Sequence, residues 1–312
     1  MAVSGSKDYS ITRATIIETA LRRIGEFDQG ESVPGDEVST ADISLNLIVK
    51  EWVARGIDIW LRDEITLFLQ PDTKLYALGT ANATASYVET TLSAAEASGQ
   101  TVLSVTDSTG MTAADYAGIK MDDDTIHWST IASVDSTTQI TIDDATDDDA
   151  ASGNKVYTYT TKAGRPTKLL YAYRRDVNDF DTEVKLIGEK DYMSQSNKSS
   201  EGPPVEAWYQ PTLTTGSLYV WPVDGGANWD KLVLSAQYYP DDFDAAGDNP
   251  EFPIEWGNTL VWNLAAELAS EYGVPEKEQA RLWRIAEHKL NELLDYDVEN
   301  ASVEFALEID GR

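Results

Sequence analysis

Residues 252–297 read FPIEWGNTLVWNLAAELASEYGVPEKEQARLWRIAEHKLNELLDYD, and we expect the rest of the chain to be organised around them. In the first half, apolar residues recur every three or four positions, which lays one apolar stripe along a helix. Gly273 ends this helix, and Pro275 fits the first position of a second one, where a missing N–H is harmless. Because so short a connection makes the two helices antiparallel neighbours, their stripes must share a core.

Two further helices are predicted near the N-terminus. Thr12 fits the N-cap of a helix that ends at Gly25. Ser39, followed by Asp42, resembles a capping box and predicts the start of a helix that ends at Gly56. We therefore expect a four-helix unit that is closed by both ends of the chain.

Between these helices the sequence changes to short strand-like segments separated by polar turns. Residues 87–161, rich in Thr, Ser, Ala and Asp, predict an inserted module, and residues 162–250 predict a more aromatic sheet. The expected fold class is α+β, a helical bundle built from N- and C-terminal helices, with a β-sheet region and an inserted small antiparallel β-barrel or sandwich. The predicted segments are the N-terminal helices (1–60), a first β segment (61–86), the inserted β module (87–161), the β-sheet region (162–250), the C-terminal helix pair (251–297) and an extended C-terminal arm (298–312).

Composition limits the classes of function. The 312 residues include 54 acidic and 24 basic side chains, for a formal net charge of -30 at pH 7. A surface so acidic repels phosphate backbones and disfavours ordinary nucleic-acid binding. Cysteine is absent, which excludes disulfides, zinc–thiolate sites and cysteine nucleophiles. No apolar run approaches the length of a membrane span and the first residues are polar, so we expect a soluble protein of the cytosol.

Few residues are candidates for catalysis or metal binding. His127 and His288 lack a second ligand at metal spacing, so we expect each to be solvated or locally hydrogen-bonded. The acidic runs at 122–124, 143–144 and 147–149 lack the glycine of an EF-hand loop and predict solvated turns. Motifs typical of nucleotide binding, serine hydrolysis or zinc proteolysis are missing. We predict no catalytic residue, no cofactor and no metal.

Three blocks of sequence carry a family resemblance. The first is ITRATIIETALRRIGEFDQGE with the later WVARGIDIW, and the last is FPIEWGNTLVWNLAAELASEYGVP. The middle block comprises RPTKLLYAYRR, IGEKDYMSQSNKSSEGPPVEAWYQP and GSLYVWPV. Together they resemble the head-to-tail adaptor proteins of tailed, above all short-tailed, bacteriophages, also called connectors or tail accessory factors. The insert, with TLSAAEASGQTVLSVTDSTGM and IHWSTIASVDSTTQITI, resembles a β module of phage structural proteins.

The resemblance implies a structural protein without enzymatic activity. Such a protein forms a ring of twelve subunits beneath the portal, at the head–tail junction of the virion, after assembly in the host bacterial cytoplasm. Its implied partners are the portal protein, the tail or nozzle proteins and the tail fibres. Double-stranded DNA passes through the ring without specific binding, and the ring helps to retain packaged DNA.

Two sets of residues are expected to make these contacts. The C-terminal helices carry more aromatic surface than a four-helix core needs, which predicts a core and subunit interface at Trp256, Trp262, Tyr272 and Trp283. Alternating side chains in the extended arm predict portal contact through Ser302, Val303, Phe305, Leu307 and Ile309. Acidic side chains on the channel wall would keep DNA mobile, because like charges oppose adhesion.

Two other classes of function remain open. A tail-associated peptidoglycan hydrolase would use paired carboxylates, but among 54 acidic residues the sequence selects no pair. A glycan-binding or adhesion module would use exposed aromatic side chains of the insert, namely Trp128, Tyr116 and Tyr157.

Overall fold

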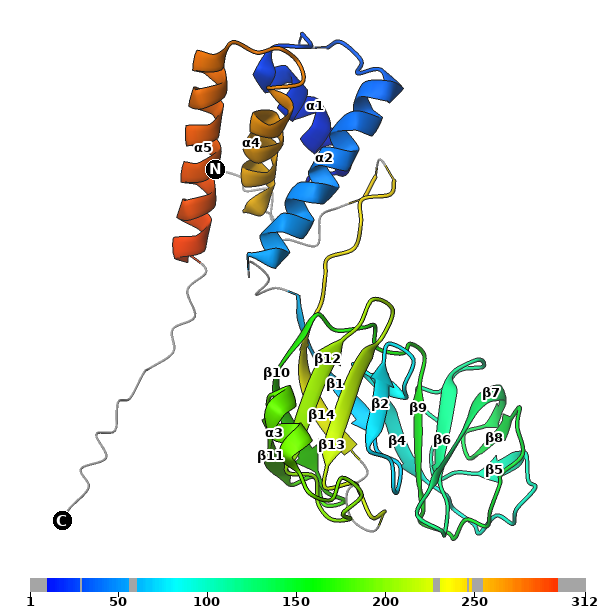
Figure 1. The fold of residues 1–312 in the computed structure, drawn as a ribbon. Coiled ribbons are helices and arrows are strands. Elements are labelled where there is room, and N and C mark those ends of the chain that lie inside the picture. The colour runs from blue at the N-terminus through cyan, green and yellow to red at the C-terminus, as the bar shows by residue number, and fades with distance from the viewer. Residues whose placement is uncertain are drawn as a thin grey trace, which may run out of the picture. The chain divides into compact units, whose positions relative to one another are not determined.

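The computed structural model describes residues 10–28, 30–55, 61–226, 231–245, 247–248 and 255–296. The described chain is mostly β, with curled sheets of eight and six strands beside five helices (Figure 1). The expected α+β fold based on a helical bundle is therefore wrong. The segments read as a minor β region form two full sheets with hydrophobic cores of their own, and these outweigh the helices.

The chain divides into two compact units. The helical unit comprises Met1–Leu61 and Tyr239–Arg312, and the β unit comprises Arg62–Tyr238. The described helices of the helical unit are α1 (Arg13–Ile24), α2 (Gly35–Ala54), α4 (Trp256–Leu268) and α5 (Glu276–Tyr296). None of the described helices is both long enough and apolar enough to cross a membrane.

Helix α4 is the centre of the helical unit, because it contacts α1, α2 and α5. Ile16 of α1, Leu45 of α2 and Leu264 of α4 are fully buried in one shared core. Each such side chain contributes about 1.5–3 kcal/mol on burial, and together they stabilise the packing of the N-terminal helices α1 and α2 on the C-terminal helix α4.

Local sequence signals set both ends of α1 as predicted. Thr12 is the N-cap of α1, and its side-chain oxygen accepts a hydrogen bond from the Thr15 backbone N–H. Gly25 follows α1 with a left-handed φ of 84°. Gly273, the predicted end of α4, also has a positive φ of 64°, but α4 itself ends at Leu268, five residues earlier. Glycine is favoured at both places because a Cβ would be strained there.

The predicted start of α2 at Ser39 is wrong. The helix begins at Gly35, after Pro34, and the Ser39 hydroxyl donates to the Gly35 carbonyl from inside the helix. Asp36 and Glu37 occupy the first turn, where negative charge is favourable at the positive end of the helix dipole. These charges allow a start one turn earlier than the capping box indicated. Gly56, the predicted end, lies outside the described residues.

The eight-stranded sheet has the order β2-β13-β12-β11-β10-β14-β1-β3. Its interior strand β14 (Lys231–Gln237) is buried along nearly its whole length. The short helix α3 (Glu189–Ser194) links β11 to β12, the one parallel pair among the described pairings of this sheet. The other strands are β1 (Arg62–Phe68), β2 (Leu75–Leu78), β3 (Ala83–Thr84), β10 (Lys168–Arg175), β11 (Asp181–Leu186), β12 (Glu206–Pro211) and β13 (Gly216–Trp221).

The six-stranded sheet has the order β4-β9-β6-β7-β8-β5, and its described pairings are antiparallel. Alternate residues such as Ile140 and Ile142 point into its core, as expected for strands with one buried face. Its strands are β4 (Val88–Thr91), β5 (Val102–Ser104), β6 (Tyr116–Lys120), β7 (Ile126–Ser136), β8 (Gln139–Ile142) and β9 (Lys155–Tyr159).

An aromatic cluster joins the two sheets of the β unit. Phe68, at the end of β1, contacts the rings of Tyr87, Trp128, Tyr157 and Tyr159 at centroid distances of 4.7–6.1 Å. A nearby side chain, Gln70, both donates to the Ile126 carbonyl and accepts from the Ile126 N–H. The six-stranded sheet is therefore packed on its neighbour and is not a loosely tethered insert.

Candidate functional site

The residues predicted to form a subunit interface lie in different environments. Trp256 is only 3% exposed, and its ring lies 5.6 Å from that of Trp52 in the helical core. Trp283 of α5 is 48% exposed and faces away from that core. Trp256 therefore already has its packing partners, and Trp283 is the member of the set that is open to another molecule.

The other two members are partly covered by their own chain. The Arg23 guanidinium lies 4.0 Å from the ring centroid of Trp262, a cation–π contact. The Tyr272 hydroxyl donates to the Glu37 carboxylate and thereby joins the α4–α5 turn to α2. Burial, followed by the hydrogen bond with Glu37, raises the pKa of Tyr272.

Two exposed apolar residues of α2 are also available for contact with another molecule, and the sequence did not single them out. Ile43 and Leu47 are each 64% exposed and lie one turn apart. The inward face of α2 contains Leu45, Ile48 and Trp52, so these two fall on the opposite side. The helical spacing of Ile43 and Leu47 relative to the buried positions of α2 could have indicated that both are exposed. The residues predicted for the portal-binding arm (Ser302, Val303, Phe305, Leu307 and Ile309) lie outside the described residues.

The aromatic residues considered for glycan binding belong to the junction of the two sheets. Tyr157 is fully buried, and Trp128 and Tyr116 are half-buried against the same cluster. The expectation that Tyr157 is exposed is wrong, because it packs against Phe68 from the other sheet. This cluster has the packing of a core and not of an open stacking platform.

His127 is locally hydrogen-bonded and His288 is solvated, the two environments that the sequence predicted. His127 is buried, with Nδ1 2.7 Å from an Asp147 carboxylate oxygen and Nε2 3.3 Å from the Asp144 carbonyl. His288 is exposed on α5, where Nε2 lies 3.4 Å from Glu292.

The acidic runs hold turns of the six-stranded sheet. One oxygen of Asp122 accepts from the Ala151 N–H and the Asn154 side chain, at 2.8 Å each. Asp123 accepts from the hydroxyl and N–H of Thr125, and these bonds lower the pKa of the Asp123 carboxyl. Within the described ranges, no three His, Asp or Glu side chains are grouped closely enough to hold a metal ion.

A polar cluster also lies between the two sheets of the β unit. The Glu89 carboxylate of β4 accepts from Lys155 of β9 at 2.5 Å and from Lys231 of β14 at 2.9 Å. Lys231 is 1% exposed, and its ammonium lies 3.4 Å from Asp179. Burial is the largest single influence and lowers the Lys231 pKa, but the hydrogen bond with Glu89 and the nearby charges of Glu89 and Asp179 together outweigh it, so the pKa is raised. The rings of Tyr87 and Tyr157 lie within 5.8 Å of the same nitrogen.

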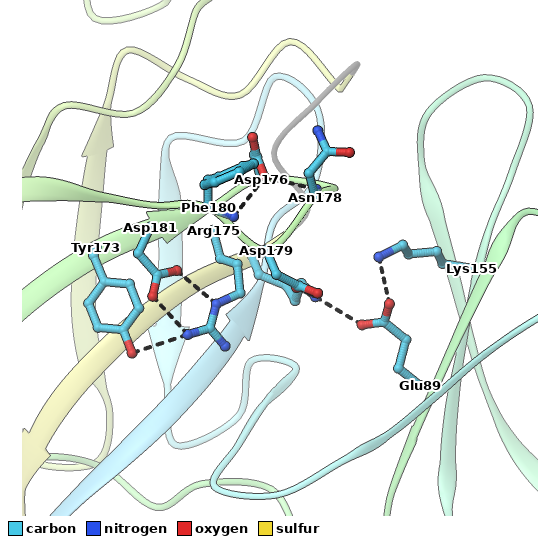
Figure 2. Close-up of polar contacts among 10 residues, drawn as sticks. Glu89, Lys155, Tyr173, Arg175, Asp176, Asn178, Asp179, Phe180 and Asp181 are labelled. Atoms are coloured by element: carbon cyan, nitrogen blue, oxygen red, sulfur yellow. Dashed lines mark hydrogen bonds and ion pairs between the residues drawn. The ribbon is translucent and has the colours of Figure 1, made fainter.

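The β10–β11 hairpin holds Asp179 in this cluster. Figure 2 shows Arg175 and Asp181 pointing at each other at the loop end of the hairpin, with two bonds of 2.8 and 3.0 Å. Asp176 accepts from the backbone of Asn178 and Phe180 and closes the turn. The hairpin is thereby fixed on both sides of Asp179.

A pocket of 280 Å³ adjoins the polar cluster. Lys120 and Lys155 both line it, but Lys120 donates to the carbonyls of Asp124 and Gly226, and Lys155 is bound to Glu89. Because both ammonium groups are held by acceptors of the chain, the cluster has the properties of a structural junction between sheets.

Two strips on the helical unit remain as the candidate functional site. We define the α2 strip as Asp36, Thr40, Ile43, Leu47 and Glu51, and the α5 strip as Lys277, Ala280, Trp283, Arg284 and Leu294; each is made of exposed residues. No protein-family model matches this chain, and no curated protein is significantly similar to it.

Proposed function

We propose that this chain is a structural head-to-tail adaptor of a tailed bacteriophage, one subunit of a ring that joins the head to the tail beneath the portal. It acts by binding and not by catalysis. Its partners are the portal protein, further copies of itself, and tail proteins. DNA passes through the ring without specific binding.

One observation carries this proposal. The first and last blocks that resemble adaptor proteins lie on either side of the β unit in sequence, yet α1, α2 and α4 bury their apolar faces in one core. Ile17, Leu45 and Leu260 are all fully buried there. The resemblance therefore concerns segments that fold together, which supports reading them as one functional unit.

The charge of the chain is compatible with a DNA channel. A net charge of -30 opposes adhesion of a phosphate backbone, so a ring with carboxylates on its inner wall would let a duplex slide. Exposed apolar side chains on α2 and α5 supply surface for contacts with other proteins.

The test is the mass of the purified protein alone and after mixing with the portal ring of the same phage, measured by light scattering or native mass spectrometry. We expect a complex that contains a full ring of subunits on the portal. No association at low or moderate salt would contradict the proposal, and clearing of purified cell wall would favour the hydrolase instead.

We further propose that the C-terminal arm, residues 298–312, binds the portal. Deleting residues 300–312 is then expected to abolish portal binding while circular dichroism and the unfolding midpoint stay unchanged. A deleted protein that binds portal as well as the full chain would rule this role out.

A further inference from the structure

The two strips lie on opposite flanks of the helical unit. Helix α4 is buried on nearly every side and lies between α2 and α5 (Figure 1). Each outer helix uses one face against α4 and leaves the other to solvent. A two-fold dimer uses the same surface patch on both copies. A contact between the α2 strip of one copy and the α5 strip of another uses two different patches on opposite flanks, so it is not a two-fold contact.

The α2 strip is apolar at its centre and acidic at its ends. Ile43 and Leu47 form the exposed apolar pair, and Asp36 and Glu51 lie about one to two turns to either side of it. Burial of such a pair against a partner would remove apolar surface from water.

The α5 strip combines an exposed indole with two cations, and the exposed Glu287 lies farther along the same face of the helix. Trp283 offers a large, half-exposed indole, with Ala280 beside it and Leu294 three turns along. Lys277 and Arg284 flank the indole, and neither forms an ion pair with any residue in the described part of the chain. Tryptophan and arginine are also the residue types most often found at the energetic centres of protein interfaces.

We propose that the α5 strip of one copy of this chain packs against the α2 strip of the next copy. Trp283 then covers Ile43 and Leu47, while Lys277 and Arg284 meet the acidic ends of the α2 strip. Because copies with a net charge of -30 repel each other, these cations are placed where they offset repulsion. The contact is head-to-tail, so its repetition generates a ring when the rotation closes. The inference rests on the proposed function, since it names the subunit contact of that ring.

A pair of charge variants tests the contact. Trp283→Glu places a carboxylate in the α5 strip alone, and Leu47→Glu places one in the α2 strip alone. Both positions are exposed, so both variants are expected to keep the circular dichroism spectrum of the unaltered chain. Leu213→Glu, at a 94% exposed position of the β unit, is the matched control.

The expected result is loss of the ring-sized complex for Trp283→Glu and for Leu47→Glu, and an unchanged complex for the Leu213→Glu control. A mixture of the two variants retains one intact strip pair, so it should form a one-to-one dimer but no ring. Rings formed by either variant alone, or a mixture without dimers, would overturn the inference.

A cross-linking measurement separates this inference from the proposed function. The chain has no cysteine, so Leu47→Cys with Ala280→Cys introduces the only thiols. A short bismaleimide should give a ladder of multimers in the double variant and none beyond dimers in either single variant. A ladder without portal binding would leave the contact standing and overturn the adaptor function. Portal binding without a ladder would overturn the contact alone.

Discussion

The ammonium nitrogen of Lys231 lies 2.9 Å from a carboxylate oxygen of Glu89, and this ion pair joins the two sheets of the β unit. Lys231 begins the interior strand β14 of the eight-stranded sheet, and Glu89 lies in the edge strand β4 of the other. A lysine so deeply buried is tolerated only with its charge paired. The relative position of the sheets is thus tied to one electrostatic contact as well as to the aromatic cluster around Phe68.

Removing one partner of this pair should destabilise the β unit. Glu89→Gln leaves the buried Lys231 ammonium without its closest anion, which typically costs about 3 kcal/mol. The measurement is urea-induced unfolding of the full chain. Lys155→Met is the matched control, because it removes only the more exposed partner of Glu89 and should cost about 1 kcal/mol. Equal losses in the two variants would show that the buried pair has no special role.

The same pair predicts a dependence of stability on alkaline pH. The folded-state pKa of Lys231 is raised above its ordinary 10.5, so the contribution of the pair is complete below pH 10.5 and is lost as the pH rises through the folded pKa. Burial also raises the pKa of Tyr159, which lowers the stability of every variant in that range. The informative quantity is therefore the difference in unfolding free energy between the unaltered chain and Glu89→Gln, measured from pH 8 to pH 11. We expect it to shrink toward pH 11, and a constant difference would contradict this explanation.

The sequence predicted what depends on neighbouring residues and missed what depends on distant ones. Thr12 and Gly25 lie directly at the two ends of α1, so their roles were readable. Glu89 and Lys231 are 142 positions apart, and nothing in either segment indicates the other. The same limit explains the wrong fold class, because pairing between strands far apart determines how large each sheet becomes.

The candidate interface shows this limit on a smaller scale. Trp256 and Trp283 both lie on apolar stripes of their helices, and helical periodicity treats them alike. Only the position of α4 between its neighbours decides that Trp256 faces the core and Trp283 faces solvent.

Gly118 is predicted to be intolerant of any side chain. A Cβ at this position of β6 would lie 2.6 Å from the Trp128 ring, so the ring must move and the aromatic cluster with it. Gly118→Ala should lower the unfolding free energy by about 2 kcal/mol, as overpacking does, and change the near-ultraviolet circular dichroism. Gly164→Ala is the control, because a Cβ there meets the Tyr238 ring at an ordinary 3.8 Å. An unchanged spectrum and stability for Gly118→Ala would show that the cluster can adjust.

Phe68 should be the residue that most strongly couples the two sheets. Phe68→Ala removes the ring that contacts four aromatic neighbours and is expected to cost about 4 kcal/mol. Amide hydrogen exchange should accelerate in β4 and β9 as well as in β1. Phe180→Ala, which truncates a 71% exposed ring in the same unit, serves as the control and should have little effect. Acceleration confined to β1 would mean that the sheets are stable independently.

The contrast between Trp256 and Trp283 gives the last prediction. Trp256→Ala leaves a cavity beside Trp52 in the helical core and should lower the unfolding free energy by about 4 kcal/mol. Trp283→Ala removes a ring that is still about half covered by its own subunit and should lower it by only about 1–2 kcal/mol. Urea unfolding followed by far-ultraviolet circular dichroism, at a protein concentration low enough to keep the chain monomeric, measures both. Because the two residues have the same side chain, any difference must come from their surroundings. A loss of several kcal/mol for Trp283→Ala in the monomer would mean that its ring stabilises its own subunit, and the α5 strip would then lose its central residue.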